Sequence, residues 1–245
     1  MATGTELINA GIIACVIFYI IMVVGYFLSR HSLREIWTNI HNSFRTKLEA
    51  EITEEEKDSG RVFDLGATKT NIRNAITVDI QETANLTVNL EKKWNLGEDS
   101  AKVIFSNQVI EHIRNKDNFF EQAHKTLADG GKLIIGTENM SSWHNIFALI
   151  MGWQAFSQTI SEKQRIGNPL APNLNETREQ KPEKYGYPLH NTIFTTYGLR
   201  QMARLHGFKV EKTICWGYFP LWPWVAEYDK THAMLIGIVA RKVKK

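Results

Sequence analysis

The pattern of hydrophobic and polar residues begins with a long apolar run near the N-terminus. Residues 7–28 carry no charge and match the roughly 20 residues that a helix needs to cross a bilayer. A buried helix of a soluble protein would show a polar stripe, and a cleaved signal peptide would show a basic start and a small-residue cleavage site. The run has none of these, so residues 1–30 are predicted to form a transmembrane anchor.

Positive charge flanks this run on one side only. Arg30, Arg34, Arg45 and Lys47 follow it, and no Lys or Arg precedes it. Because basic residues stay on the cytoplasmic side, the sequence predicts a single-pass membrane protein whose remaining residues lie in the cytoplasm.

Residues 31–59 show a helical pattern followed by an acidic linker. Apolar residues recur at three- and four-residue spacing, which is typical of one helix face: Leu33, Ile36, Trp37, Ile40, Phe44 and Leu48. That face either lies on the bilayer surface or packs on the following domain. The run EITEEEKDSG then interrupts the pattern and ends at Gly60, which indicates a hinge or cap.

From Arg61 the pattern changes to short apolar strands that alternate with helices. Strands are predicted at RVFDL, AITVDI, LTVNL, AKVIFS, GKLIIGTE, KVEKTICW and HAMLIGIVARKV, with helices at 116–127 and 194–207. Residues 129–131, DGG, are expected to end the first of these helices, and residues 138–192 are expected to be an irregular insertion on the substrate side. The prediction for residues 60–245 is an α/β, Rossmann-like domain with a mostly parallel seven-stranded sheet and helices on both faces.

Composition limits the possible partners. The formal charge of +3 and a single basic cluster at the C-terminus do not favour nucleic-acid binding. Cys15 and Cys215 are far apart and suggest neither a disulfide framework nor a thiolate metal site. Nothing in the pattern predicts an oligomeric state.

Polar residues stand where several predicted strands end. In open parallel sheets a ligand binds at the carboxyl ends of the strands. Those ends carry Asp64, Gly66, Asp79, Asn89, Asn107 and Gln108. A carboxylate at Asp79 suits two ribose hydroxyls, because charge-assisted hydrogen bonds are about twice as strong as neutral ones.

These segments resemble the class I S-adenosylmethionine-dependent methyltransferases, especially those acting on small molecules, quinones and glycans. VFDLG, TVDI, SNQVIEHI and LADGGKLIIGTEN are similar to successive motifs of that family. The resemblance implies S-adenosylmethionine as cofactor. It places Asp64 and Gly66 beside the methionine half, Asp79 and Ile80 at the ribose, Asn89 and Leu90 at the adenine, and Asn107 and Gln108 at the fourth strand end.

The chain departs from the family pattern at the cofactor loop. DLGATKT has one glycine where the family usually has three, and glycines there let the backbone approach the cofactor closely. The connection from Leu65 to Ile76 is also short, so its helix is expected to span one or two turns.

Histidine is the side chain best suited to remove a proton from a hydroxyl acceptor near pH 7. His112, in VIEHI, is the leading candidate, with Glu111 beside it and His190 and His144 as further candidates. Glu111 and His112 alone are too few ligands for a divalent ion, so the sequence predicts no metal site.

The expected function is a membrane-anchored methyltransferase that modifies a hydroxyl or carboxyl of a glycan, glycolipid or quinone-like acceptor. Two aromatic stretches, around residues 143–156 and 216–224, are either core or a rim facing the substrate or the membrane. The first alternative is a catalytically silent domain that serves as a binding module at the membrane. A dinucleotide or nucleotide-sugar enzyme is disfavoured, because no G-x-G-x-x-G follows the first strand.

Overall fold

The computed structural model describes residues 30–161, 166–170, 189–219 and 221–243, together with the single positions Ile17 and Ile20. The strands are β1 (Val62–Leu65), β2 (Ile76–Asp79), β3 (Leu86–Thr87), β4 (Ala101–Asn107), β5 (Leu127–Glu138), β6 (Phe208–Trp216) and β7 (Leu235–Lys242). The helices are α2 (Arg30–Glu49), α3 (Glu54–Asp58), α4 (Lys116–Thr126), α5 (Trp143–Ile150) and α6 (Thr196–Leu205), with a 3₁₀ helix η2 (Pro223–Glu227). All seven predicted strands are present.

The strands form one sheet in the order β3-β2-β1-β4-β5-β7-β6. Neighbours from β3 to β5 are parallel, and β7 runs antiparallel to both β5 and β6. The chain order therefore reverses between β1 and β4, and the carboxyl ends of these strands meet at one edge. The mostly parallel, Rossmann-like sheet predicted from the sequence is confirmed.

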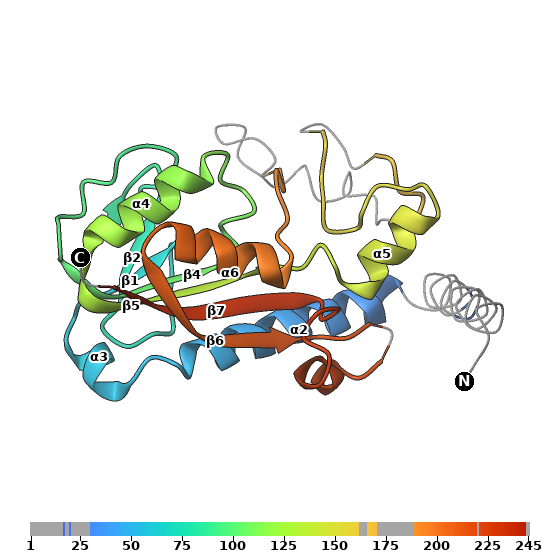
Figure 1. The fold of residues 1–245 in the computed structure, drawn as a ribbon, viewed down its shortest axis with the longest axis horizontal. Helices are drawn as coiled ribbons and strands as arrows, with labels where there is room; N and C mark the ends of the chain where they lie inside the picture. The colour runs from blue at the N-terminus through green and yellow to red at the C-terminus, as the bar shows by residue number, and fades with distance from the viewer. Residues whose placement is uncertain are drawn as a thin grey trace.

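Helices cover both faces of this sheet (Figure 1). On one face α4 and α6 pack through Phe119, Phe120, Leu199 and Ala203, all fully buried. On the other face lies α2, drawn in blue in Figure 1, whose Phe44 and Leu48 are also fully buried. Two apolar layers thus sandwich the sheet, and each layer removes large side chains from water.

Helix α2 is part of the domain and does not stand apart from it. Of its two predicted roles, the structure shows packing on the sheet, where a Cβ on Gly136 or Gly237 would lie under 3.0 Å from Leu48. The absence of side chains on these strand glycines lets the helix approach closely. The acidic run after α2 forms α3, which Thr53 and Glu56 cap reciprocally.

Two local predictions were wrong. Residues 129–131 do not end α4; they lie inside β5, where pairing with β4 shifts between Leu127 and Lys132 and Gly130 has a φ of +70°. The DGG sequence therefore makes a bulge in a strand. The connection between β1 and β2 contains turns and bends but no helix; its ten residues are at the lower limit for a crossover that includes one.

The segment expected to be irregular, 138–192, contains the helix α5. The predicted anchor, residues 7–28, lies outside the described residues apart from Ile17 and Ile20. Among the residues that the structure describes, no helix is long and apolar enough to cross a membrane.

Candidate active site

The carboxyl ends of β1, β2 and β4 bring together most of the polar residues selected from the sequence. Asp64 lies in β1, Asp79 ends β2 and Asn107 ends β4, with Gly66 and Gln108 in the loops that follow. The register pairs Asp64 with both Thr77 and Phe105, so β1 is the central strand of this edge. The structure therefore places these residues where a nucleotide-like cofactor binds in such sheets.

Gly66 is the one glycine of the loop, and its position requires glycine. Its φ is +72°, and an added Cβ would lie 2.3 Å from Cγ2 of Val109. Its amide donates to the carbonyl oxygen of Val78 at 2.7 Å, which holds the turn against β2. The loop thus keeps the close-approach glycine at its first position although the later glycines are missing.

Asp64 is fully buried beneath this loop and pairs with a residue from α2. Arg45 donates from Nη2 to Asp64 Oδ2 at 2.7 Å, and from Nε to Glu49 at 2.6 Å. Asp64 Oδ1 accepts no hydrogen bond from any described residue. Burial raises the pKa of Asp64, and the Arg45 guanidinium opposes this rise. One buried carboxylate oxygen therefore remains to accept a hydrogen bond from a ligand.

Asp79 is half-buried at the end of β2, and its Oδ1 accepts from the amide of Gln81 at 2.9 Å. This bond fixes the carboxylate in place and leaves its acceptor capacity toward the edge. Ile80 beside it is exposed, Asn89 is half-buried, and Leu90 packs in the core next to Trp94. Their contacts with ribose and adenine stay predictions.

Asn107 ends β4 and Gln108 follows it, on the strand next to β1. Gln108 has a φ of +59°, a left-handed conformation that is costly for a residue with a side chain. Asn107 Oδ1 and Gln108 Nε2 are buried and have no hydrogen-bond partner among the described residues. Unsatisfied buried polar atoms at a strained turn indicate a binding site more than a structural cap.

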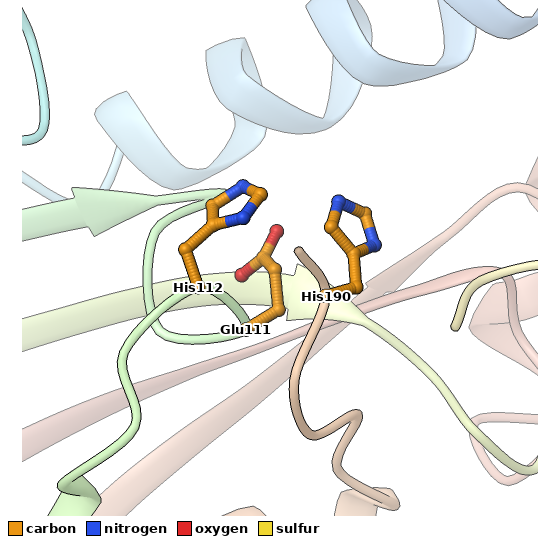
Figure 2. Close-up of side chains that lie close together, drawn as sticks. All are labelled: Glu111, His112 and His190. Atoms are coloured by element: carbon orange, nitrogen blue, oxygen red, sulfur yellow. The ribbon is translucent and has the colours of Figure 1, made fainter. Parts of the chain in front are cut away.

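The three predicted catalytic residues, Glu111, His112 and His190, lie together (Figure 2). One ligand atom from each of them lies within 4.8 Å of the other two. The two imidazole rings flank the Glu111 carboxylate, with ring centroids 4.7 Å apart. Their catalytic roles stay predictions. The structure nevertheless brings His190, which is distant in sequence, next to Glu111 and His112.

Asn191 holds the two segments of this cluster together. Its amide donates to the carbonyl oxygen of Glu111 at 2.8 Å, and its side-chain Nδ2 donates to the carbonyl oxygen of His112 at 3.0 Å. Thr137 on β5 donates from its hydroxyl to Glu111 Oε2 at 2.8 Å. The side chains are therefore positioned by backbone pairing and by the sheet, which fixes their geometry before a substrate arrives.

The hydrogen bonds of the two rings determine their protonation. His112 Nδ1 lies 3.1 Å from the carbonyl oxygen of Leu189, and His190 Nδ1 lies 2.6 Å from that of Ser157. A carbonyl can only accept, so both Nδ1 atoms carry a proton, and in a neutral ring with this hydrogen bond the lone pair is on Nε2. Complete burial, reinforced by the charge of Glu138, raises the pKa of Glu111 to about 8.

His144, the remaining histidine candidate, is not one of the three clustered residues, but it shares Ser157 with His190 as a hydrogen-bond partner. It is buried on α5, where its Nε2 lies 3.3 Å from the hydroxyl of Ser142 and 3.4 Å from that of Ser157. Trp37 of α2 packs edge-on against its ring. These contacts attach α5 to the rest of the domain, so the structure gives His144 a packing role.

Three residues of the site have no motif in the sequence. Arg45 and His41 come from α2, and Glu138 ends β5 with a carboxylate oxygen 3.9 Å from His190 Nδ1. His41 is close enough to Glu138 and His190 for their charges to act on its pKa, which burial lowers. The partners of Arg45 and His41 are distant in sequence. The one sequence signal for a role in the site is that each is a charged or polar residue on an otherwise apolar helix face.

The site has the features that S-adenosylmethionine requires. A buried carboxylate oxygen at Asp64 suits an ammonium group, and Asp79 suits a ribose diol. Asn107 and Gln108, at the end of β4 on the other side of β1, supply two further unsatisfied polar atoms. The residues present therefore fit this cofactor, and the cluster of Glu111, His112 and His190 adjoins it along the chain after β4.

Comparisons with known proteins agree with this geometry. The family model described as a methyltransferase domain matches residues 36–213, which is more than half of the chain. A putative methyltransferase of Haloferax volcanii, in complex with the Trm112 methyltransferase activator, is similar in structure, with a TM-score of 0.54 at 13% identity over 86% of this chain and 93% of the other. A putative S-adenosylmethionine-dependent methyltransferase of Listeria monocytogenes has a TM-score of 0.50 at 15% identity, over 83% of this chain and 100% of the other.

No curated protein sequence matches the chain. The two structural likenesses establish the fold, and the family model covers β1 to β5 and most of β6. The chain therefore belongs to the methyltransferase domain family and is a methyltransferase that uses S-adenosylmethionine.

Proposed function

We propose that this methyltransferase acts on an oxygen nucleophile, a hydroxyl or a carboxyl, of an amphipathic or lipid-linked acceptor such as a glycan, glycolipid or quinone-like molecule. S-adenosylmethionine supplies an electrophilic methyl group. The chain positions the acceptor and removes its proton, and its predicted N-terminal anchor holds it at the cytoplasmic face of a membrane.

The cluster of Glu111, His112 and His190 is the observation that supports an oxygen nucleophile in the acceptor. Two imidazole rings, each with Nδ1 donating to a carbonyl oxygen, stand beside a buried carboxyl group, and a neutral ring held in this way accepts a proton at Nε2. A hydroxyl needs this help, because it is a poor nucleophile until its proton is removed. An uncharged amine would not need it.

The observation that favours a lipid-linked acceptor is an apolar groove on α2. It has a volume of about 460 Å³ and is lined by Ile36 and Ile40 of α2 and by Trp216, Phe219, Leu221 and Trp222. Trp222 is 67% exposed although it is large and apolar. The groove shares no residue with the cluster, but α2 directly follows the apolar run 7–28, so a membrane-anchored chain presents this groove near the bilayer.

The acceptor class is tested with methyl-labelled S-adenosylmethionine and three probes on one aromatic skeleton, bearing a hydroxyl, a carboxyl or an amine. We expect label on oxygen, and faster transfer to a probe with a long alkyl chain than to a short-chain probe. Trp222→Ser is expected to raise the KM for the long-chain probe and to leave the short-chain KM unchanged. Transfer to the amine alone would contradict the proposal.

The anchor is tested by expressing the full chain and a variant in which Ile13 and Ile20 are both replaced by lysine. Charged residues at the centre of a membrane helix each cost about 2.5–3.5 kcal/mol on insertion scales. The unmodified chain is therefore expected to resist alkaline extraction from membranes, and the variant is expected to be released. Equal extraction of both would remove the anchor from the proposal.

A further inference from the structure

We propose that Glu111, His112 and His190 bind one divalent transition-metal ion, Zn²⁺ in preference to Mg²⁺, and that this ion receives the acceptor's oxygen. The role assigned to the ion rests on the proposed function, whereas the binding site itself rests on geometry alone. The sequence argument against a metal counted two ligands, and the structure adds His190 as the third.

The distances fit a single ion with small adjustments. One ligand atom from each residue already lies within 4.8 Å of the others. Ligands of a tetrahedral zinc at about 2.1 Å lie about 3.4 Å apart, so the side chains need to close by roughly 1.4 Å at most. Both histidines are half-buried and Glu111 is fully buried. The cluster therefore differs from the groups of exposed acidic side chains that are common on protein surfaces.

Each ligand is oriented by an outer hydrogen bond of the kind that metal sites use. The Nδ1 atoms of His112 and His190 donate to the carbonyl oxygens of Leu189 and Ser157, which leaves Nε2 of each ring as the ligand nitrogen. Thr137 donates to Glu111 Oε2 and fixes the carboxylate. A metal-binding histidine characteristically donates its other ring N–H to a carbonyl or a carboxylate, and both rings here do so.

A second observation indicates a cation directly. Glu111 has no exposed surface, and its Oε1 accepts no hydrogen bond from any residue that the structure describes. Figure 2 shows this carboxylate aimed between the two rings. Glu138 adds a second carboxylate near His190, at 3.9 Å from its Nδ1. An unsatisfied buried carboxylate is costly, and a bound dication would satisfy it.

The donor types select the metal. Two imidazole nitrogens and one carboxylate suit zinc, iron or cobalt, whereas magnesium and calcium prefer oxygen ligands. Three protein ligands leave a fourth position open, which is typical of catalytic zinc sites. The open position is where the acceptor's hydroxyl oxygen would bind.

The ion would lower the pKa of the bound hydroxyl, so its proton leaves to solvent water. The oxygen then attacks the methyl carbon: the O–C bond forms, the C–S bond breaks, and the sulfur keeps the electron pair as an uncharged thioether. In this form of the reaction the histidines hold the ion and do not themselves take the proton.

The test uses untagged full-length protein, dialysed against a chelator and titrated with Zn²⁺ by calorimetry and with Co²⁺ by visible absorption. We expect one ion per chain, and competition by Zn²⁺ but not by Mg²⁺. His112→Gln, His190→Gln and Glu111→Gln are each expected to weaken binding by about 100-fold or more, because even outer hydrogen-bond partners contribute about 10–100-fold. S-adenosylmethionine binding by each variant shows that it is folded.

The matched control is His232→Gln. His232 also pairs with a carboxylate, with Nδ1 2.7 Å from Asp229, but it lies outside the cluster, and metal affinity is expected to be unchanged. No saturable binding by the folded protein, or wild-type binding by the His190 variant, would overturn the site.

The same samples separate the metal site from the proposed function. If one zinc ion binds at the cluster but no hydroxyl probe is methylated, the metal site is supported and the proposed acceptor class is wrong. Full-rate methylation of a hydroxyl by zinc-free protein would keep the acceptor class and overturn the ion's role.

Discussion

Arg45 donates from Nη2 to Asp64 Oδ2 at 2.7 Å, and this ion pair joins the helix that follows the predicted anchor to the strand that carries the cofactor motif. Asp64 has 1% of its side chain exposed and Arg45 has 26%. The pair thus couples the position of α2 to that of the cofactor loop, which begins two residues after Asp64. Arg45 also lies over the ring of Phe105 in β4, which fixes the guanidinium from the sheet side.

Arg45→Met should destabilise the fold and weaken cofactor binding. Removing one member of a buried pair costs about 3–5 kcal/mol, and the partial exposure of Arg45 places the expected loss at or below the lower end of this range. Urea unfolding measures the loss, and calorimetry measures the affinity for S-adenosylmethionine.

Arg73→Met is the matched control for the Arg45 variant. Arg73 pairs with Glu54 and Asp58 on the surface, and exposed pairs contribute about 0–1 kcal/mol. If both variants lost the same stability, the Arg45–Asp64 pair would have no special role. Asp64→Asn combined with Arg45→Met should lose less than the sum of the two single changes.

Gly66→Ala should be far more damaging than Gly60→Ala, although both glycines have positive φ angles, +72° and +62°. A Cβ at position 60 would contact nothing within 4 Å, so only the left-handed conformation is penalised, by about 1–2 kcal/mol. At position 66 the Cβ would also overlap Val109 at 2.3 Å, which adds about 1–3 kcal/mol.

Thermal and urea unfolding of the two glycine variants measures this difference. Val109→Ala added to Gly66→Ala should recover the part of the loss that comes from overlap. No recovery would show that the loop, and not Val109, is responsible.

His112→Ala should lower turnover and leave cofactor affinity unchanged if, as we propose, the cluster binds the acceptor and not the cofactor. His112 activates the acceptor's hydroxyl either as the base or as a ligand of the ion, and losing this activation is expected to reduce kcat by about 10²–10⁴-fold. His144→Ala is the comparison: its buried hydrogen bonds contribute about 1–3 kcal/mol to folding, but kcat of the folded fraction should be retained. Steady-state kinetics at saturating S-adenosylmethionine distinguish the two, and equal losses of kcat would contradict the assignment.

Much of the fold was predictable because most of its strands are short apolar runs, and each of the seven runs predicted as a strand overlaps one. The polar strand ends Asp79 and Asn107 were predictable for the same reason, since the carboxyl ends of parallel strands share an edge. The failures were local. The residues at 129–131 fit both a helix stop and a bulge, and only pairing with β4 selects the bulge.

The assembly of the site was not predictable from spacing. His190 meets Glu111 and His112 through Asn191, a contact across nearly eighty residues for which a single sequence carries no periodic signal. Arg45 and His41 are a charged and a polar residue near the apolar face of α2, and only the sheet packed against that face shows which partners they have. Long-range pairing, and not local propensity, decides which charged side chain becomes part of a site.

The measurement that tests the account most directly is calorimetric titration of S-adenosylmethionine into the protein and its Asp79→Ala variant, with Asp129→Ala as control. Asp129 is an exposed carboxylate in β5, at the end of the sheet away from the site. A carboxylate that binds the ribose contributes about 1.5–3 kcal/mol, so affinity should fall about 10–100-fold in the Asp79 variant and stay unchanged in the control. Equal affinity in all three proteins would contradict the placement of the cofactor at the end of β2.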